Sequence, residues 1–243
     1  MSLKNVPLID WRFGDKYYVI EFVRPDTYEV ERVSEELKGK DDLETFLNVC
    51  KYIRDNFYYP LDWRKQPSCD GQFLKSRRGL STYHFRRCVP YMWMFPSEVI
   101  NCGFGICIDT ALLCTSIFRK LGFISYVTLG ALKDKKGRII GYHAWTETLL
   151  RGKWFLIETT IHTKSAVNHI PREDGYNGRW GIYYVPFAWF NEKEYIERES
   201  ILQFVKFFGK SKREIRKMEK RKQNIIWKVF DKIDFNIKEV IEG

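Results

Sequence analysis

Three residues of this sequence could together carry out covalent catalysis on an amide: a cysteine, a histidine and a glutamate. Cys107 follows Gly103 and Gly105 and opens a segment of helical periodicity that ends before Gly122. A helix N-terminus and a nearby imidazolium both favour the thiolate, which is the reactive form of cysteine. The first free N–H groups of such a helix could also bind an oxyanion. We therefore predict that Cys107 is a nucleophile that reacts with iodoacetamide below neutral pH.

A base is needed within hydrogen-bond reach of this thiol, and the chain has four histidines to supply it: His84, His143, His162 and His169. His143 lies inside a strand-like run, where packing would fix its rotamer. His84 lies in a stretch without periodicity. His162 and His169 follow the strand-like run that contains Trp154, in segments with no clear pattern. The sequence therefore indicates His143 as the base.

The imidazole also needs an acceptor that orients it, and Glu158 is the candidate. Glu158 lies late in the next strand-like run, and a turn at Arg151-Gly152 brings the two runs together antiparallel, a short step from His143. A carboxylate in an otherwise apolar strand needs a partner. Each of the three residues alone is more often structural, but their joint arrangement favours catalysis.

The elements that must position these residues predict an α+β fold. A helix is expected over Asp41–Phe57, because its apolar residues share one face and acidic residues lie at its start. The cysteine helix should pack on an antiparallel meander of three strands. The expected strands are Ile124–Leu132, Ile139–Leu149 and Trp154–Thr159.

Two further strands are expected at Lys16–Val23 and Trp180–Val185, where β-branched and aromatic residues predominate. Residues 61–96 combine glycines, prolines, basic residues and aromatics without sustained periodicity. Such a stretch is either a surface insertion with short helices or a functional lid.

Length and composition suit one domain with an extension. The 243 residues are 44% hydrophobic, enough for a full core without metals or disulfides. We predict a catalytic domain over residues 1–200, with its core at about 41–160, and a helical extension over 201–243.

Several classes of protein are disfavoured. No secretory leader and no apolar run of membrane-spanning length is visible, so we expect no membrane span and a cytoplasmic location. The six cysteines are expected to be free thiols. Their closest spacings, C-x4-C and C-x6-C, do not suit zinc, and we expect neither a metal nor another cofactor.

The C-terminal segment is strongly basic. Between Ile201 and Phe230, ten Lys and Arg stand against two Glu, so most of the net charge of +10 lies there. We expect an apolar stripe packed on the domain and a cationic outer face that includes Trp227. With so few aromatics, any contact of Lys206–Lys228 with an anionic partner should be weak, electrostatic and salt-sensitive.

The candidate residues resemble the motifs of transglutaminase-like enzymes of the papain-like superfamily. Those enzymes carry G-x-C-x-[DE]-x-A at a helix start, H-A-W-x-E on a strand and W-x-x-[ILV]-D-x-T on the next. This sequence has GICIDTA at Gly105–Ala111, HAWTE at His143–Glu147 and WFLIETT at Trp154–Thr160. The resemblance covers roughly Asp41 to Thr160, and it implies the transglutaminase-like, papain-like core.

By this resemblance Cys107 is the nucleophile, His143 the general base and Glu158 the third member of a triad. The sequence departs from the family at Glu158, where Asp is usual; the longer side chain requires the backbone to lie slightly farther back. In the family, a side chain upstream of the cysteine helps to hold the oxyanion. Gln72 and Trp93 are the candidates here.

The resemblance also implies the reaction, which is attack of a thiolate on an amide carbonyl of a protein or peptide. Water as the acceptor gives a hydrolase and a lysine amine gives a cross-linking enzyme, while peptide N-glycanases are further members. We predict a cysteine protease, because selecting an amine over water needs a dedicated tunnel. The alternative is a catalytically inactive scaffold that binds an acidic partner or nucleic acid.

Overall fold

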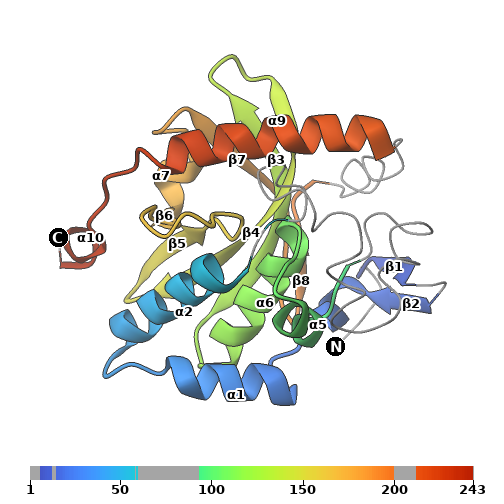
Figure 1. Ribbon diagram of the computed structural model, residues 1–243, viewed down its shortest axis with the longest axis vertical. Coiled ribbons are helices and arrows are strands. Elements are labelled where there is room, and N and C mark those ends of the chain that lie inside the picture. Colours follow the sequence, from blue (N-terminus) through green and yellow to red (C-terminus); the bar gives the residue numbers. More distant parts are fainter. Residues whose placement is uncertain (1–5, 13–14, 58, 60–92, 200–211, 243) are drawn as a thin grey trace.

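A computed structural model describes residues 6–12, 15–57, 59, 93–199 and 212–242 of the chain. Helices and strands combine in an α+β fold, as the sequence predicts (Figure 1). Gln72, most of the expected insertion at 61–96 and the expected domain boundary near residue 200 lie outside the described residues.

A six-stranded antiparallel sheet forms the centre of the molecule, in the order β6-β5-β4-β3-β7-β8. The expected meander of three strands is confirmed, and the strand expected at Trp180–Val185 is present as β7, which pairs with β3. The strands are β3 (Ser125–Asp134), β4 (Ile139–Leu150), β5 (Lys153–Ile157), β6 (His169–Pro171), β7 (Ile182–Phe190) and β8 (Tyr195–Glu197).

A tight turn sets the register between β4 and β5. Arg151 and Gly152 both have positive φ, 49° and 78°, which is the combination of a type I′ hairpin turn. The strands then pair residue by residue from the turn to Thr146 opposite Ile157. Glu158 follows directly, so the hairpin brings its carboxylate alongside the strand that carries the histidine.

The helix α6 (Cys107–Lys120) packs on β4 and β3, with all of its residues from Cys107 to Phe118 buried. The expected helix from Cys107 is confirmed, and Gly122 follows its end with a φ of 87°, as expected of a C′ glycine. At the contact with β4, the Thr146 hydroxyl donates to the Ala111 carbonyl at 3.1 Å. The helix that begins at Cys107 is therefore fixed against the sheet by a hydrogen bond as well as by packing.

Further helices cover α6. The expected helix α2 (Asp42–Asn56) is confirmed, with the Asp41 side chain as its N-cap at 2.8 Å from the Glu44 amide. Two helices that were not predicted, α1 (Tyr28–Leu37) and α5 (Pro96–Cys102), also pack on α6. A short helix, α7 (Arg172–Tyr176), lies between β6 and β7.

The strand expected over Lys16–Val23 is wrong in its second half. A two-stranded sheet of β1 (Leu8–Arg12) and β2 (Asp15–Tyr18) ends there, and η1 (Val19–Phe22) continues as a 3-10 turn. Val19, Ile20 and Phe22 are all buried. A strand would turn alternate side chains to opposite faces, whereas the turn directs three of four into one core.

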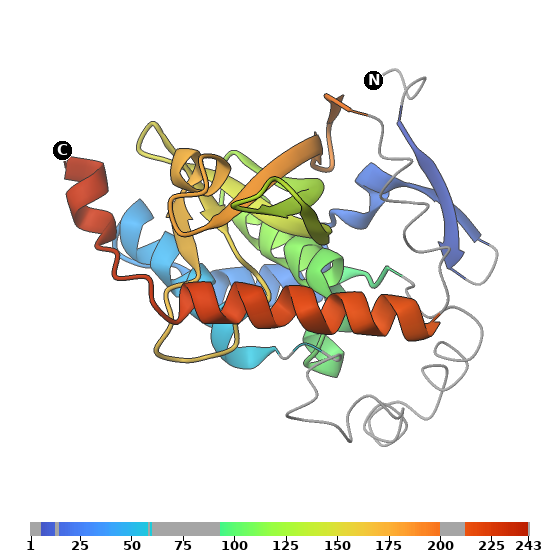
Figure 2. The ribbon, with the colours of Figure 1, turned by 90° about the horizontal axis from the view of Figure 1, so that it is seen from above.

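The C-terminal helices α9 (Lys212–Phe230) and α10 (Ile237–Glu242) contribute to the same cores as the sheet. Both views place α9 beside the N-terminal end of α6 (Figure 1 and Figure 2). The expectation for Trp227 is wrong: it is buried at 5% exposure rather than lying on an outer face. Its indole N–H donates to the Thr160 carbonyl at 2.9 Å, which holds it inside. In the part of the chain that the structure describes, no helix is long and apolar enough to cross a membrane.

Candidate active site

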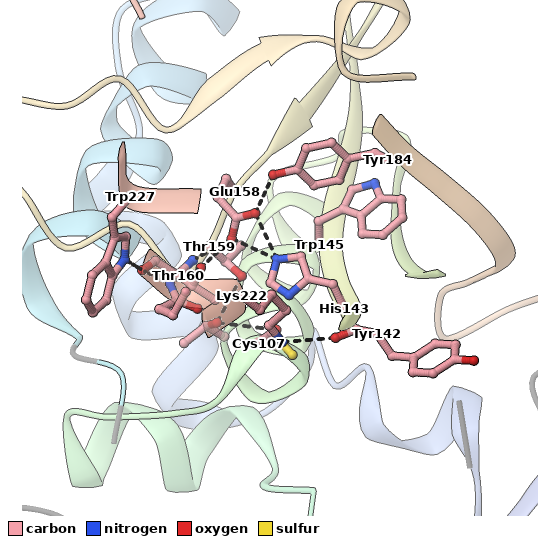
Figure 3. A network of polar contacts seen from close by, with 12 residues as sticks. Cys107, Tyr142, His143, Trp145, Glu158, Thr159, Thr160, Tyr184, Lys222 and Trp227 are labelled. Carbon is pink, nitrogen blue, oxygen red and sulfur yellow. Dashed lines mark hydrogen bonds and ion pairs between the residues drawn. The ribbon is translucent and has the colours of Figure 1, made fainter. Parts of the chain in front are cut away.

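Cys107 at the start of α6, His143 in β4 and Glu158 directly after β5 meet at one place (Figure 3). The Nε2 atom of His143 lies 2.8 and 3.0 Å from the two carboxylate oxygens of Glu158. The other ring nitrogen, Nδ1, lies toward the thiol of Cys107. With its Nε2–H donating to the carboxylate, the neutral ring keeps Nδ1 as an acceptor for the thiol proton.

Local interactions place the thiol at the helix start. The backbone of Ile106 is extended, and its N–H donates to Asp109 Oδ2 at 3.0 Å. The other oxygen of Asp109 accepts from the Met94 amide at 2.8 Å, so one carboxylate ties the incoming segment to the first turn. A Cβ at Gly105 would lie 2.9 Å from the Cβ of Asp109. The glycine of the motif is therefore needed for this close approach.

Aromatic neighbours hold the ring of His143, whose exposed fraction is zero. The ring lies 6.3 Å from that of Trp145, nearly parallel at 27°, and 6.3 Å from that of Tyr184. Gly130 is the β3 partner of His143, and a Cβ there would lie 2.5 Å from the Trp145 ring and 2.3 Å from a backbone oxygen. The imidazole therefore has a fixed position in the sheet.

Glu158 accepts hydrogen bonds from four donors although it is fully buried. Besides His143 Nε2, these are the Thr160 amide at 3.1 Å, the Thr160 hydroxyl at 2.6 Å and the Tyr184 hydroxyl at 2.7 Å. Burial opposes ionisation, but the charge of His143 and these donors together lower the pKa of Glu158. The longer side chain that departs from the family pattern thus still reaches the ring as an ionised acceptor.

The electrostatics of the pair favour the charged ring. Burial lowers the pKa of His143, but the adjacent Glu158 carboxylate outweighs burial and raises it to about 9. An imidazolium formed by taking the thiol proton is therefore stabilised at neutral pH.

This raised pKa predicts a loss of stability at alkaline pH. The pKa of about 9 in the folded protein lies above the ordinary histidine value of 6.5, which applies to the unfolded chain. The stabilisation that His143 provides is therefore complete below pH 6.5 and is lost as the pH rises to 9. In the Cys107→Ala protein, where no thiol titrates at position 107, the free energy of unfolding should fall by on the order of 1–3 kcal/mol across this interval. Urea unfolding at a series of pH values measures it.

The matched control for this measurement is the same protein with His143→Gln, which cannot titrate. Its free energy of unfolding should show a much shallower dependence over the same interval. The lowered pKa of Glu158 acts in a different window, because its contribution is lost only as the pH falls below the ordinary carboxyl value of 4.5. Equal slopes for the two proteins would contradict the assignment of the raised pKa to His143.

The remaining described cysteines and His169 belong to the packing. Cys50, Cys102 and Cys114 are buried, and burial raises the pKa of Cys114 to about 12. His169 packs edge-on against Phe46 at 5.5 Å, and burial lowers its pKa to about 4. No group of three or more His, Cys, Asp or Glu within the described residues is arranged to hold a metal ion.

Of the two oxyanion candidates, only Trp93 is described. It is buried at 1% exposure, with its ring stacked over Phe190 at 6.3 Å and edge-on to Phe22 at 5.3 Å. The next residue, Met94, is the one whose amide bonds to Asp109 in the first turn of α6. Trp93 therefore directly precedes the residue that is hydrogen-bonded to the first turn of the Cys107 helix.

Sequence reasoning missed several residues that complete the site. Tyr184 and Thr160 bind the carboxylate, and α9 adds Lys222 and Gln223. The Gln223 amide donates to the Thr160 hydroxyl at 2.7 Å, and the Lys222 amine donates to the Tyr142 carbonyl at 2.9 Å. Tyr184 lies in a strand that the sequence predicts, but the sequence does not indicate that its hydroxyl bonds to Glu158. Lys222 is one of ten basic residues in its segment, and nothing local distinguishes it.

Comparisons with known proteins show which family the chain resembles. A family model described as a transglutaminase-like domain matches residues 28–166. Among curated proteins, the UPF0252 protein MJ1282 of Methanocaldococcus jannaschii is 26% identical over 130 residues, which are 53% of this chain and 32% of that protein. The chain therefore spans about a third of the length of the curated relative that it matches.

Two solved structures are also similar. A structure described as a TGase is 17% identical, with a TM-score of 0.34 over 58% of this chain and 31% of that one. A Cytophaga hutchinsonii protein, provisionally described as a cysteine protease, is 17% identical, with a TM-score of 0.38 over 69% of this chain and 46% of that one.

Proposed function

The chain belongs to the transglutaminase-like domain family, and on this basis we propose that it is a thiol-dependent amide hydrolase that acts on a protein or peptide, a cysteine protease. Cys107 is the nucleophile, His143 the general base and Glu158 the residue that orients the ring. The observation that carries the proposal is the position of His143, with Nε2 at 2.8 Å from the Glu158 carboxylate and Nδ1 toward the thiol.

The first half-reaction forms an acyl-enzyme. Nδ1 of His143 takes the proton of Cys107, and the thiolate attacks the amide carbonyl carbon. The oxyanion of the tetrahedral intermediate is bound by the first N–H groups of α6, and Trp93 contributes from the neighbouring segment. When the intermediate collapses, the C–N bond breaks and the imidazolium gives its proton to the leaving amine.

The second half-reaction regenerates the enzyme. His143 takes a proton from water, the resulting hydroxide attacks the thioester carbonyl, and the C–S bond breaks to release a carboxylic acid. The imidazolium of His143 then gives its proton to the departing sulfur of Cys107, which restores the thiol. Throughout, Glu158 stays ionised and keeps Nε2 protonated, so that Nδ1 alternates between acceptor and donor.

Selective alkylation tests the nucleophile. We expect iodoacetamide at pH 6 to modify Cys107 in the folded protein about tenfold faster than Cys114 or more, because His143 lies beside Cys107 as a base for its proton whereas burial raises the pKa of Cys114 to about 12. Peptide mapping after short exposure measures both rates. A Cys107 that reacts no faster than Cys114 would favour the alternative role of a binding scaffold for an acidic partner or nucleic acid.

The acyl group and its acceptor can be identified together. The enzyme is incubated with a peptide library and quenched in acid, and the Cys107 peptide is searched by mass spectrometry for a thioester. A hydrolase should then release free acid even when a primary amine is present in excess, whereas an acyl transferase should release the amide of that amine.

A further inference from the structure

The face that α9 turns toward the site carries polar side chains. Lys222 and Gln223 are 0% and 1% exposed, while Arg221 and Lys228 on the same helix are exposed. Lysine and glutamine are seldom fully buried, because the loss of hydration must be offset by specific contacts. This face therefore has a role beyond hydrophobic packing.

Part of this face binds the segment that follows Glu158. Gln223 donates to the carbonyl and the hydroxyl oxygen of Thr160 at 3.1 and 2.7 Å. Trp227 donates to the same carbonyl at 2.9 Å. Because the Thr160 hydroxyl in turn donates to Glu158 at 2.6 Å, α9 is connected to the carboxylate through one residue.

Lys222 makes the matching contact on the histidine strand. Its amine donates to the carbonyl of Tyr142, the residue before His143, at 2.9 Å. Its aliphatic stem crosses β4 at Gly141, where an added Cβ would lie 2.8 Å from the Lys222 Cδ and 3.2 Å from its Cγ. The glycine leaves the space that this side chain occupies, and Figure 3 shows the amine within the group of catalytic side chains.

The titratable groups that face His143 lie on α6, on α9, on β7 and directly after β5. Within the described residues, the Glu158 carboxylate after β5 and the Cys107 thiol of α6 raise the pKa of the ring, and the Lys222 ammonium of α9 lowers it. The Tyr184 hydroxyl of β7 bonds to the carboxylate, and burial keeps the pKa of Tyr184 above its ordinary value. Within the described residues, Lys222 is thus the cation that acts on the imidazole.

We propose that Lys222 is a positioning residue of the catalytic site, which holds the backbone of β4 at His143 and places a fixed positive charge beside the imidazole. This role rests on the proposed function of the triad. A carboxylate alone would hold the imidazolium so firmly that returning its proton to the leaving amine would be slow. A nearby ammonium weakens that hold, so it assists the return of the proton to the leaving amine.

The titration of His143 itself tests this role without a substrate. Histidine resonances are followed by NMR over a pH series in the full chain carrying Cys107→Ala, and His143 is assigned from the spectrum of the His143→Gln variant. We expect Lys222→Met and Lys222→Gln to raise the midpoint of His143 by roughly half to one pH unit. Lys222→Arg should leave it near its original value. Lys228→Met, which removes an exposed charge from the same helix, is the matched control and should not move it.

The two neutral variants differ in the contact with Tyr142. Methionine removes the donor, whereas glutamine keeps N–H groups for the carbonyl, so the charge can still be tested if loss of the donor prevents folding. An unchanged midpoint in the folded neutral variants, or an equal shift in Lys228→Met, would overturn the proposal. Loss of folding in the methionine, glutamine and arginine variants alike would also overturn it, since Lys222 would then serve packing alone.

Failure of this inference can be distinguished from failure of the proposed function. If Cys107 is alkylated selectively but the midpoint of His143 ignores Lys222, the triad stands and Lys222 has no part in it. If the midpoint responds to Lys222 but Cys107 is unreactive, the electrostatic coupling exists in a protein that lacks the proposed activity.

Discussion

Cys107→Ala is expected to lower kcat/KM by about 10⁴-fold or more, because removal of a covalent nucleophile eliminates the acyl-enzyme route. The fold should persist, since the exchange removes one sulfur atom from a side chain that is 3% exposed. Turnover of the peptide identified by thioester capture measures the loss, and near-UV circular dichroism checks the fold.

Cys114→Ala is the matched control for this variant. It makes the same chemical change on the same helix, at a side chain that is 0% exposed and has Thr146 as a partner. It should cost about 1–2 kcal/mol of stability and retain turnover within a few fold. If Cys107→Ala turns over as fast as Cys114→Ala does, the nucleophile lies elsewhere.

The second large effect is expected for Glu158→Gln, which should lower kcat/KM by about 10²–10⁴-fold. Glutamine offers one oxygen in place of two. If that oxygen accepts from the amide and hydroxyl of Thr160, the NH2 group faces His143 Nε2. The ring must then accept at Nε2 and carry its proton on Nδ1, which removes the acceptor that faces Cys107. Loss of the carboxylate charge should also lower the midpoint of His143 from about 9.

Glu147→Gln controls for the loss of a buried carboxylate. Glu147 is 1% exposed and accepts from the indole N–H groups of Trp145 and Trp189 at 2.8 and 3.1 Å. Among the described residues its hydrogen-bond partners are Trp145, Tyr176 and Trp189 rather than His143, so the variant should lose stability without a comparable fall in the midpoint of the ring. A Glu158→Gln protein with the rate and midpoint of the parent would show that the carboxylate does not orient the histidine.

The central part of the site could be predicted because short-range features determine it. The residues at the start of one helix place Cys107. A two-residue turn between two strands brings His143 and Glu158 together. The hairpin allows little choice of register, since each strand must keep its apolar residues on the buried side. Only 15 positions separate the two residues of the pair.

The residues that complete the site depend on long-range packing, and the sequence alone does not reveal it. Tyr184 reaches Glu158 from β7, and the pairing of β7 with β3 rather than with the preceding strand β6 is not encoded locally. Lys222 was expected among solvated charges, because basic residues usually face water. Its burial depends on a space that Gly141 leaves about 80 positions earlier in the chain.

The order of the residues in the chain gives the α9 contacts a consequence for biosynthesis. Translation begins at the N-terminus, so Cys107, His143 and Glu158 leave the ribosome well before Lys222, Gln223 and Trp227. At about 5–20 residues per second, several seconds pass between the synthesis of Glu158 and that of the helix that binds the segment beside it. During that interval a nascent chain carries the thiol but lacks the contacts that hold the carboxylate and the histidine strand. The α9 contacts are therefore added to the proposed catalytic centre only after its three side chains have been made.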